Sequence, residues 1–425
     1  MWLCARRRHV SWTTAEKFLL SGLLPTDASR HRLRRLLIEQ ASTIDWEVVR
    51  SRGSRLQVLP LIRFNLTQGR EDQEDLTIRL PSALRTHLRT QAEEWAAREL
   101  AYLREVRHLI SLLQAQGIPS LPLKGAALML AGYYPQPGLR PAVDIDLLVA
   151  PEDVQAADAI LARYEYRPLP GQRKVRDSQR LPNQRNHLWP RRGPTGIVVE
   201  LHHRAFQVVA SEEEVGFPEL WARARSIGAG FLPLPSPGDL ALHLIHHSMV
   251  DLQSGHLILR TLADLFFLVR KSPESFDQAR RLAAQLGFPG IVPLAEQAVH
   301  HLEVANLEAL EVDAAHPDLA LLFETAMLPS HEHLAEAARF FEYFDLARHP
   351  FKKIRALASF LAPSREHLDQ LYGRAEPDGP AAPAVSRWHY LRRPFDLLRR
   401  IDWRSLRPAM VRRVRHWKRL PTRQD

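Results

Sequence analysis

Apolar residues recur every three or four positions over long parts of this sequence, which is the spacing of amphipathic helices. The longest such stretch covers residues 82–116, with Ser82 as its predicted N-cap and with Gly117 and Pro119 placed to end it. Shorter helices are predicted near the N-terminus, over residues 15–24 and 32–44. Four more are predicted in the C-terminal half, over residues 240–249, 257–270, 276–286 and 290–303.

Between these helical parts, the pattern changes to short apolar runs bounded by glycine and proline. Residues 121–124 and 143–149 predict buried strands, and each is followed by a predicted helix, at 126–131 and 151–164. A further pair of strands is predicted over residues 186–190 and 196–204, joined by a turn at 191–194. The block from about residue 117 to 208 therefore mixes helices with strands.

The composition is that of an ordinary globular protein, with 45% hydrophobic and 25% charged residues among 425. This length suits two or three domains of roughly 100–200 residues each. Cys4 is the only cysteine, which excludes a disulfide scaffold and favours a reducing compartment such as the cytoplasm. No stretch approaches the ~18–20 apolar residues of a membrane-spanning helix, so we expect no integral membrane span. The polar residues after Arg8 argue against a signal peptide.

The net charge of +10 belongs to the C-terminal tail. Residues 386–425 hold 13 Lys and Arg against 3 Asp and Glu, whereas the other 385 residues hold 45 of each sign. Trp388, Trp403 and Trp417 are interleaved with these arginines, a pattern that suits nucleic acid or peripheral contact with an anionic membrane surface. The alternative is a helical extension that packs its aromatic side chains on the body and keeps its arginines in water.

Two acids interrupt the apolar strand pattern at 143–149. Residues i and i+2 of a strand point to the same side, so Asp144 and Asp146 are placed side by side. Two such carboxylates need a neutralising cation, and Mg²⁺ is the usual one because it takes oxygen ligands together with substrate phosphates. The alternative is a strand end whose acids reach solvent or pair with Arg140.

Two flanking segments support the metal interpretation. Lys124, Gly125 and Ala126 lie where a strand turns into a helix, so the backbone can approach a ligand and offer N–H groups to phosphate. The alternative is a plain tight turn. Downstream, Glu200 stands in another apolar strand and suggests a third acid at the same site, although alternation would equally allow it a solvent-facing position.

These segments resemble a known family. The runs Leu123–Ala127, Gly138–Pro141, Asp144–Val149 and Glu200–His202 are similar to the uncharacterised nucleotidyltransferase family of the polymerase-beta-like superfamily. Segments 242–247 and 260–264 resemble the helical half of that family, so the likeness covers about residues 95–270. It implies an α+β fold, with a small mixed β-sheet nucleotidyltransferase core flanked by N-terminal and C-terminal helical regions.

The resemblance also implies an activity, which is transfer of a nucleoside monophosphate from an NTP such as ATP to a hydroxyl of a small molecule, sugar or protein. Asp144, Asp146 and Glu200 would be the catalytic carboxylates and would hold two Mg²⁺ or Mn²⁺ ions with the bound NTP. Glu200 would also help to deprotonate the acceptor hydroxyl. This arrangement fits two-metal catalysis, in which one ion activates the attacking oxygen and the other stabilises the leaving pyrophosphate.

Lys124, Gly125, Ala126 and Arg140 are the nucleotide-binding candidates, with Gly125 and the helix after it cradling the β- and γ-phosphates. The sequence departs from the superfamily here, because the usual Gly-Ser or Gly-Gly is Gly125-Ala126 and the gap to Asp144 is longer. Lys124 is therefore a second source of a phosphate contact. These departures leave open a catalytically degenerate binding or scaffold protein, or an enzyme that modifies nucleic acid through its tail.

Several other polar residues are candidates for substrate contact or for support of the site. His187 and His202 lie in the two strands near the proposed site. For the pairs at 202–203 and 246–247, a packed or supporting role is favoured over zinc. Arg260 and Asp264 are i,i+4 on a helix, and they form either a surface ion pair or part of a helix that closes the nucleotide cleft.

The expected domain organisation divides the chain at changes of pattern and composition. It consists of an N-terminal helical region at 1–116, the nucleotidyltransferase core at 117–232, a C-terminal helical domain at 233–373, a Pro/Ala-rich linker at 374–385 and the basic aromatic tail at 386–425.

Overall fold

The computed structural model describes most of the first three hundred residues. The described ranges are 12–68, 75–169, 187–206, 215–227, 232–250, 258–286, 289–304 and 322–323. The predicted linker at 374–385 and the basic tail at 386–425 lie outside them, so the predictions for these segments are not tested.

The N-terminal region is helical, as predicted. Its helices are α1 (Thr14–Ser21), α2 (Asp27–Glu39), α3 (Trp46–Arg55) and α4 (Leu59–Thr67), with short 3-10 turns η1 (Ala41–Thr43) and η2 (Leu76–Arg79). Side chains of Thr13, Thr26 and Asp45 cap the first three helices by accepting backbone N–H bonds. The apolar faces of these helices meet in a core that includes Phe18 and Ile62.

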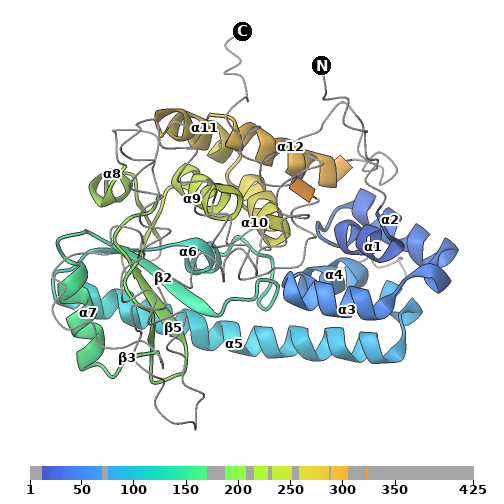
Figure 1. Cartoon of the computed structure of the whole chain (residues 1–425), viewed down its shortest axis with the longest axis horizontal. Coiled ribbons are helices and arrows are strands. Elements are labelled where there is room, and N and C mark those ends of the chain that lie inside the picture. Colours follow the sequence, from blue (N-terminus) through green and yellow to red (C-terminus); the bar gives the residue numbers. More distant parts are fainter. Residues whose placement is uncertain are drawn as a thin grey trace, which may run out of the picture.

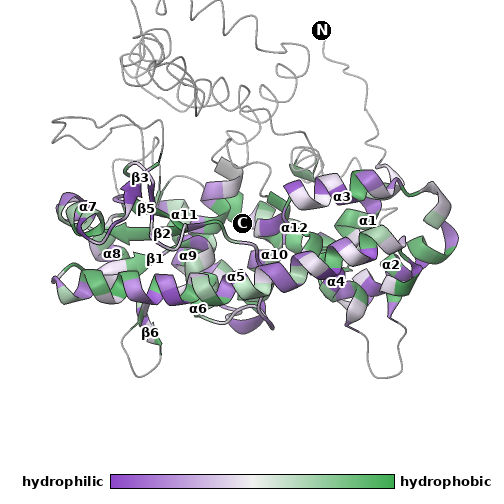
Figure 2. Cartoon of the chain, turned by 90° about the horizontal axis from the view of Figure 1, so that it is seen from below, coloured by the Kyte–Doolittle hydropathy of each residue, from purple (hydrophilic) through white to green (hydrophobic). Residues whose placement is uncertain are grey.

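Helix α5 (Ser82–Ala115) is the longest element of the described residues, with 34 residues, and it connects the N-terminal helices to the sheet. It contacts α4 at one end and strand β1 and helix α6 at the other. Figure 1 shows it running beneath the N-terminal helices and the sheet, and Figure 2 shows polar and apolar residues alternating along it. Ser82 is its first residue and Pro81 its cap, so the predicted N-cap is wrong by one position. Gly117 takes a left-handed φ of 75° and ends it as predicted.

A five-stranded mixed sheet forms the centre of the α+β fold and confirms the predicted fold class. The strands are β1 (Ser120–Pro122), β2 (Asp144–Val149), β3 (Arg167–Pro168), β4 (Arg191–Arg192) and β5 (Val198–His202), in the order β1-β2-β5-β4-β3. In this sheet β2 and β5 pair in parallel, and the other neighbouring pairs of described strands are antiparallel. Helices α6 (Lys124–Leu130) and α7 (Val154–Arg163) follow β1 and β2.

The edge of the sheet differs from the sequence prediction. Arg191 and Arg192 were predicted as a turn but form strand β4, and the turn lies at 193–196 instead. Gly196 supplies the left-handed φ of 84° that this turn requires. In the described part of the segment predicted as a strand at 186–190, His187 makes an isolated antiparallel bridge to His202.

The C-terminal part packs further helices above the sheet. Its elements are α8 (Phe217–Ala222), the hairpin β6 (Arg225–Ile227) and β7 (Leu232–Leu234), α9 (Pro237–Ile245), the π turn η3 (His246–Val250), α10 (Ile258–Lys271), α11 (Ser275–Gln285) and α12 (Ile291–Val304). Every residue of α9 is buried, because α10, α11 and α12 all pack against it. In the described ranges, no helix combines the length and the apolar character needed to cross a bilayer.

Candidate functional site

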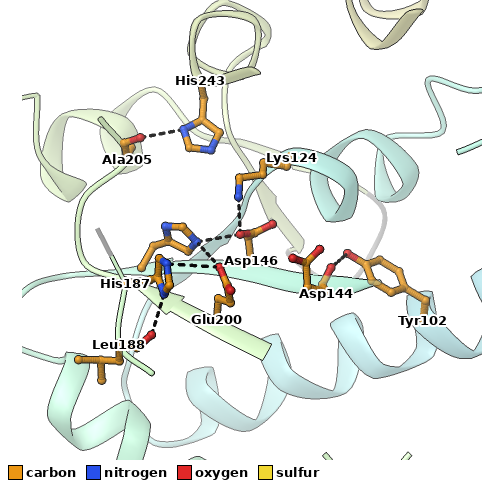
Figure 3. A network of polar contacts seen from close by, with 10 residues as sticks. Tyr102, Lys124, Asp144, Asp146, His187, Leu188, Glu200, Ala205 and His243 are labelled. Atoms are coloured by element: carbon orange, nitrogen blue, oxygen red, sulfur yellow. Dashed lines mark hydrogen bonds and ion pairs between the residues drawn. The ribbon is translucent and has the colours of Figure 1, made fainter. Parts of the chain in front are cut away.

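The parallel pairing of β2 with β5 brings three potential ligands together. Asp146 lies opposite Glu200 and Leu148 opposite His202, so the acids and the imidazole project from one face of the sheet. One ligand atom each of Asp146, Glu200 and His202 lie within 4.8 Å of one another. Figure 3 shows Asp146 and Glu200 side by side on the two strands, with Lys124 reaching toward Asp146. These three residues are the candidate metal-binding group among the described residues.

Asp146 is a buried carboxylate with two cationic or polar partners. Its Oδ1 accepts a hydrogen bond from Lys124 Nζ at 2.7 Å and lies 2.8 Å from Nε2 of His202. Burial by itself raises the pKa of Asp146, but Lys124 and His202 outweigh that effect and hold the pKa well below its usual range. Asp146 is therefore an anion at neutral pH despite being 3% exposed.

Lys124 reaches Asp146 from a strained backbone position. It has a left-handed φ of 45°, which is costly for a residue with a side chain. The neighbouring backbone is tied to the same strand, because Leu123 N–H donates to the carbonyl oxygen of Asp146 at 2.9 Å. Burial acts to lower the pKa of Lys124, but the charge of Asp146 raises it overall, so the ammonium group stays protonated.

Asp144 shares the face of Asp146 but lies outside the close group of ligands. Its backbone carbonyl accepts a bond from Tyr102 Oη at 2.8 Å, which anchors the start of β2 on α5. Burial and the charge of Asp146 together raise the pKa of the Asp144 carboxyl to about 6. Asp144 is half-buried, whereas Asp146 is buried.

Glu200 stands between two histidines. Its Oε2 lies 3.7 Å from Nε2 of His187 and 3.7 Å from Nε2 of His202. Burial acts to raise the pKa of Glu200, and the two imidazoles reverse that effect and lower it. The prediction had left open whether Glu200 faces solvent or joins the acids, and the structure places it beside Asp146.

A comparison with known families identifies the chain. The model of the uncharacterised nucleotidyltransferase family matches residues 42–303, which is more than half of the sequence. The chain belongs to this family. The match confirms the resemblance, extends it to the N-terminal helices and supports nucleotidyl transfer as the general activity. Neither a curated protein nor a solved structure matches the chain.

The side chain of Arg140 packs against Gly125, at the turn between β1 and α6. A Cβ atom on Gly125 would lie 2.2 Å from Nη1 of Arg140, so the absent side chain leaves room for the guanidinium group. Arg140 itself is 5% exposed and donates two hydrogen bonds to Asp264, at 2.8 and 2.9 Å. Ala126 is completely buried. The structure thus gives Arg140 a carboxylate partner other than Asp144 and Asp146, and its contact with phosphate stays a prediction.

Arg260 and Asp264 do not form the surface ion pair that was one of the two alternatives for their spacing, and the other, a helix that closes the nucleotide cleft, stays a prediction. Asp264 is fully buried and bonds to Arg140 and to the hydroxyl of Tyr134. Arg260 donates instead to Oε1 of Gln57 and to the carbonyl oxygen of Pro141. Burial, and then the charge of Arg140, lower the pKa of Arg260 to about 10. Within the described ranges no carboxylate forms an ion pair with Arg260, and its buried Nε has no hydrogen-bond partner.

His243 is a residue of this site that the sequence did not single out. It comes from the buried helix α9, and its Nδ1 lies 2.9 Å from the carbonyl oxygen of Ala205. Burial, and then the charge of Lys124, lower the pKa of His243 to about 3, so the ring is neutral. Its Nε2 is buried with no hydrogen-bond partner in the part of the chain that the structure describes. The sequence shows only that His243 and His247 are i,i+4 on one helix face, and without an H-E-x-x-H motif a packed or supporting role is favoured there over zinc.

Proposed function

We propose that this chain is a metal-dependent nucleotidyltransferase, which transfers a nucleoside monophosphate from an NTP such as ATP to a hydroxyl of a small molecule, sugar or protein. The observation that carries the proposal is the group of Asp146, Glu200 and His202, whose ligand atoms lie within 4.8 Å of one another beside Lys124. A reducing compartment, the cytoplasm, is the location that the single cysteine favours.

The donor set fits a divalent cation. Asp146 and Glu200 both have lowered pKa values and therefore offer negative charge at neutral pH. With His202 they would hold one ion, and Asp144, on the same face, would extend the site toward a second ion, Mg²⁺ or Mn²⁺. Divalent ions there would polarise the phosphoryl oxygens and lower the pKa of the attacking hydroxyl.

The cations around the acids supply contacts for the triphosphate. Lys124 carries a buried positive charge that reaches Asp146 from the turn after β1. Arg260 presents a second positive charge near Asp144, since the charge of that carboxylate acts on its pKa. Both groups favour a strongly anionic ligand, because Arg260 would gain a partner of opposite charge and Lys124 a second one beside Asp146, both in a poorly solvated place.

Asp144 is the carboxyl best suited to accept a proton from the acceptor hydroxyl when it does not itself bind the second ion, because a bound cation would lower its pKa. The pKa of Asp144 is raised to about 6, whereas the pKa values of Asp146 and Glu200 are lowered. A base is most effective when its pKa lies near the working pH. In this proposal Asp144 takes the role that the resemblance gave to Glu200, and Glu200 serves as a ligand.

Pyrophosphate release with each of the four NTPs, in Mg²⁺ or Mn²⁺ and with a panel of hydroxyl acceptors, tests the proposal. Transfer of α-phosphate label to an acceptor should accompany release. Asp146→Asn should lose at least ~10³-fold activity, because electrostatic groups at the reacting phosphate contribute on that order. Asp277→Asn is the matched control, since Asp277 pairs with Arg280 at the surface. Equal activity of Asp146→Asn and wild type would contradict the proposal.

A second candidate is a degenerate family member that binds nucleotide without transfer. The observation in its favour is the Gly125 turn, where the guanidinium of Arg140 packs against the glycine and is already paired with Asp264. This candidate predicts thermal stabilisation by a nucleotide with no pyrophosphate release under any acceptor. The tail at 386–425 would then carry the interaction, with nucleic acid or an anionic membrane surface as the predicted partner.

A further inference from the structure

Nitrogen donors surround the carboxylates of this site. His187 and His202 face each other through an antiparallel bridge, and their ring centroids are 5.1 Å apart. Both rings present Nε2 to the same oxygen, Oε2 of Glu200. The resemblance accounts for the acids but assigns no ligand role to these imidazoles.

The spacing of these atoms suits ligation better than hydrogen bonding. Each Nε2 lies 3.7 Å from Oε2 of Glu200, beyond the ~2.7–3.2 Å range of an N–H···O bond. Ligand atoms that share one ion at about 2.0–2.2 Å lie roughly 3.0–3.6 Å apart. Small shifts would therefore close these atoms around an ion. The 2.8 Å contact of His202 with Asp146 would open to admit it, and the proton that Nε2 donates to Asp146 would be released to solvent as the ion binds.

The hydrogen bond of His187 leaves a lone pair on its Nε2 atom, whereas Nε2 of His202 donates its proton to the Asp146 carboxylate. Nδ1 of His187 lies 2.7 Å from the carbonyl oxygen of Leu188, which can only accept a proton, so Nδ1 is the donor. Nε2 then carries a lone pair toward Glu200, and two electron-rich atoms face each other without a proton between them. A cation bound between them would satisfy both.

His243 provides an independent observation. Its Nδ1 likewise donates to a carbonyl oxygen, that of Ala205 at 2.9 Å, which leaves the lone pair on Nε2. This Nε2 is buried without a partner among the described residues, and the side chain is 4% exposed. Figure 3 shows the ring above Lys124, on the face of the sheet that carries Asp146. A buried acceptor with no donor there points to a ligand with positive charge or a proton to offer.

We infer that Asp146, Glu200 and His202, with His187 as a further ligand, form a metal site. The site prefers a first-row transition metal ion that takes nitrogen ligands, such as Zn²⁺, Co²⁺ or Mn²⁺, over Mg²⁺. Imidazole suits transition metals, whereas Mg²⁺ takes oxygen ligands and water. The inference deepens the proposed function and rests on it for the catalytic role of the ion. Metal binding itself does not require transfer to occur.

Metal titrations of the full-length, chelator-treated protein without nucleotide test the inference. Calorimetry with Mn²⁺, Zn²⁺ and Mg²⁺ should show one site with at least ~100-fold preference for a transition metal, and Co²⁺ should develop visible absorption from nitrogen ligation. His202→Asn should weaken Co²⁺ binding at least ~10-fold, and His187→Gln, at a less buried position, should weaken it as well. His108→Gln, at an exposed position on α5, is the control and should bind as wild type does.

The outcomes separate the inference from the proposed function. Mg²⁺ binding as tight as Co²⁺ binding, or unchanged Co²⁺ affinity in folded His202→Asn and His187→Gln, would overturn the inference. Transfer activity supported by Mg²⁺ in those same variants would leave the proposed function standing. Histidine-dependent metal binding in a protein that binds no NTP would support the inference and contradict the nucleotidyltransferase.

Discussion

Arg140 and Asp264 are 124 residues apart in sequence and form a buried ion pair joined by two hydrogen bonds, of 2.8 and 2.9 Å. The pair links the loop before β2 to helix α10, and the hydroxyl of Tyr134 bonds to the same carboxylate. A charge pair that is 5% and 0% exposed cannot be screened by water. Removal of one partner therefore leaves the charge of the other unpaired in a poorly solvated interior.

The first prediction is that Asp264→Asn lowers the free energy of unfolding by about 3–5 kcal/mol, because Arg140 keeps its buried charge without a counter-ion. Urea denaturation of both proteins measures this. Asp277→Asn is the matched control, because the Asp277–Arg280 pair is exposed and contributes less than about 1 kcal/mol. Equal losses in the two variants would show that the buried pair has no special part in stability.

The second prediction concerns Gly125, which the sequence assigned to a phosphate cradle. Gly125→Ala should cost about 1–3 kcal/mol of stability, because the new Cβ would lie 2.2 Å from Nη1 of Arg140. The same substitution should cost much less in an Arg140→Met, Asp264→Leu background, where the guanidinium is absent and no buried charge remains. A double-mutant cycle from urea denaturation gives the coupling. Additive losses would mean that Gly125 serves something other than the space for Arg140.

The local part of the site was predictable from the sequence. Asp144 and Asp146 could be identified from the sequence, because two acids that are two positions apart in an apolar strand must lie on the same face. Glu200 could be proposed only as an alternative, since its facing depends on the parallel register that sets it opposite Asp146. The register between two strands depends on how they pair in the folded sheet, and the spacing of residues within one strand does not predict it.

The long-range part could not be predicted. The partner of Asp264 lies in another element, so the i,i+4 spacing with Arg260 pointed to the wrong contact. Arg191 resembled a turn residue, yet it lies in strand β4 and its charge is paired with Asp158 on α7. His243 looked like a core residue, and only tertiary packing brings its ring to the acids.

The third prediction is that Arg260 contributes to triphosphate affinity. Arg260→Gln should weaken ATP binding about 10–100-fold and leave adenosine binding unchanged, because the guanidinium has no carboxylate partner among the described residues and lies near Asp144. Calorimetry with the two ligands measures the difference. Arg270→Gln is the control on the same helix, where an exposed pair with Glu303 is lost. An equal loss for ATP and adenosine would place Arg260 away from the phosphates.

The fourth prediction concerns the acid sensitivity conferred by His243. Its pKa is about 3 in the folded protein, against 6.5 when it is unperturbed, because burial and then the charge of Lys124 disfavour the imidazolium. The folded state therefore binds fewer protons than the unfolded chain between these values. Its contribution to stability is complete above pH 6.5 and is lost as the pH falls toward 3.

His243→Gln removes this titration and keeps a side chain that can donate to the carbonyl oxygen of Ala205. Between pH 7 and pH 5, the free energy of unfolding should fall by ~2 kcal/mol more for wild type than for the variant, since each pH unit below 6.5 costs about 1.4 kcal/mol. Urea denaturation of both proteins at the two pH values gives the difference. Parallel losses in the two proteins would mean that the ring gains its proton in the folded state as readily as in the unfolded chain, which would require solvent or an anion to reach the Nε2 atom that the structure shows as buried.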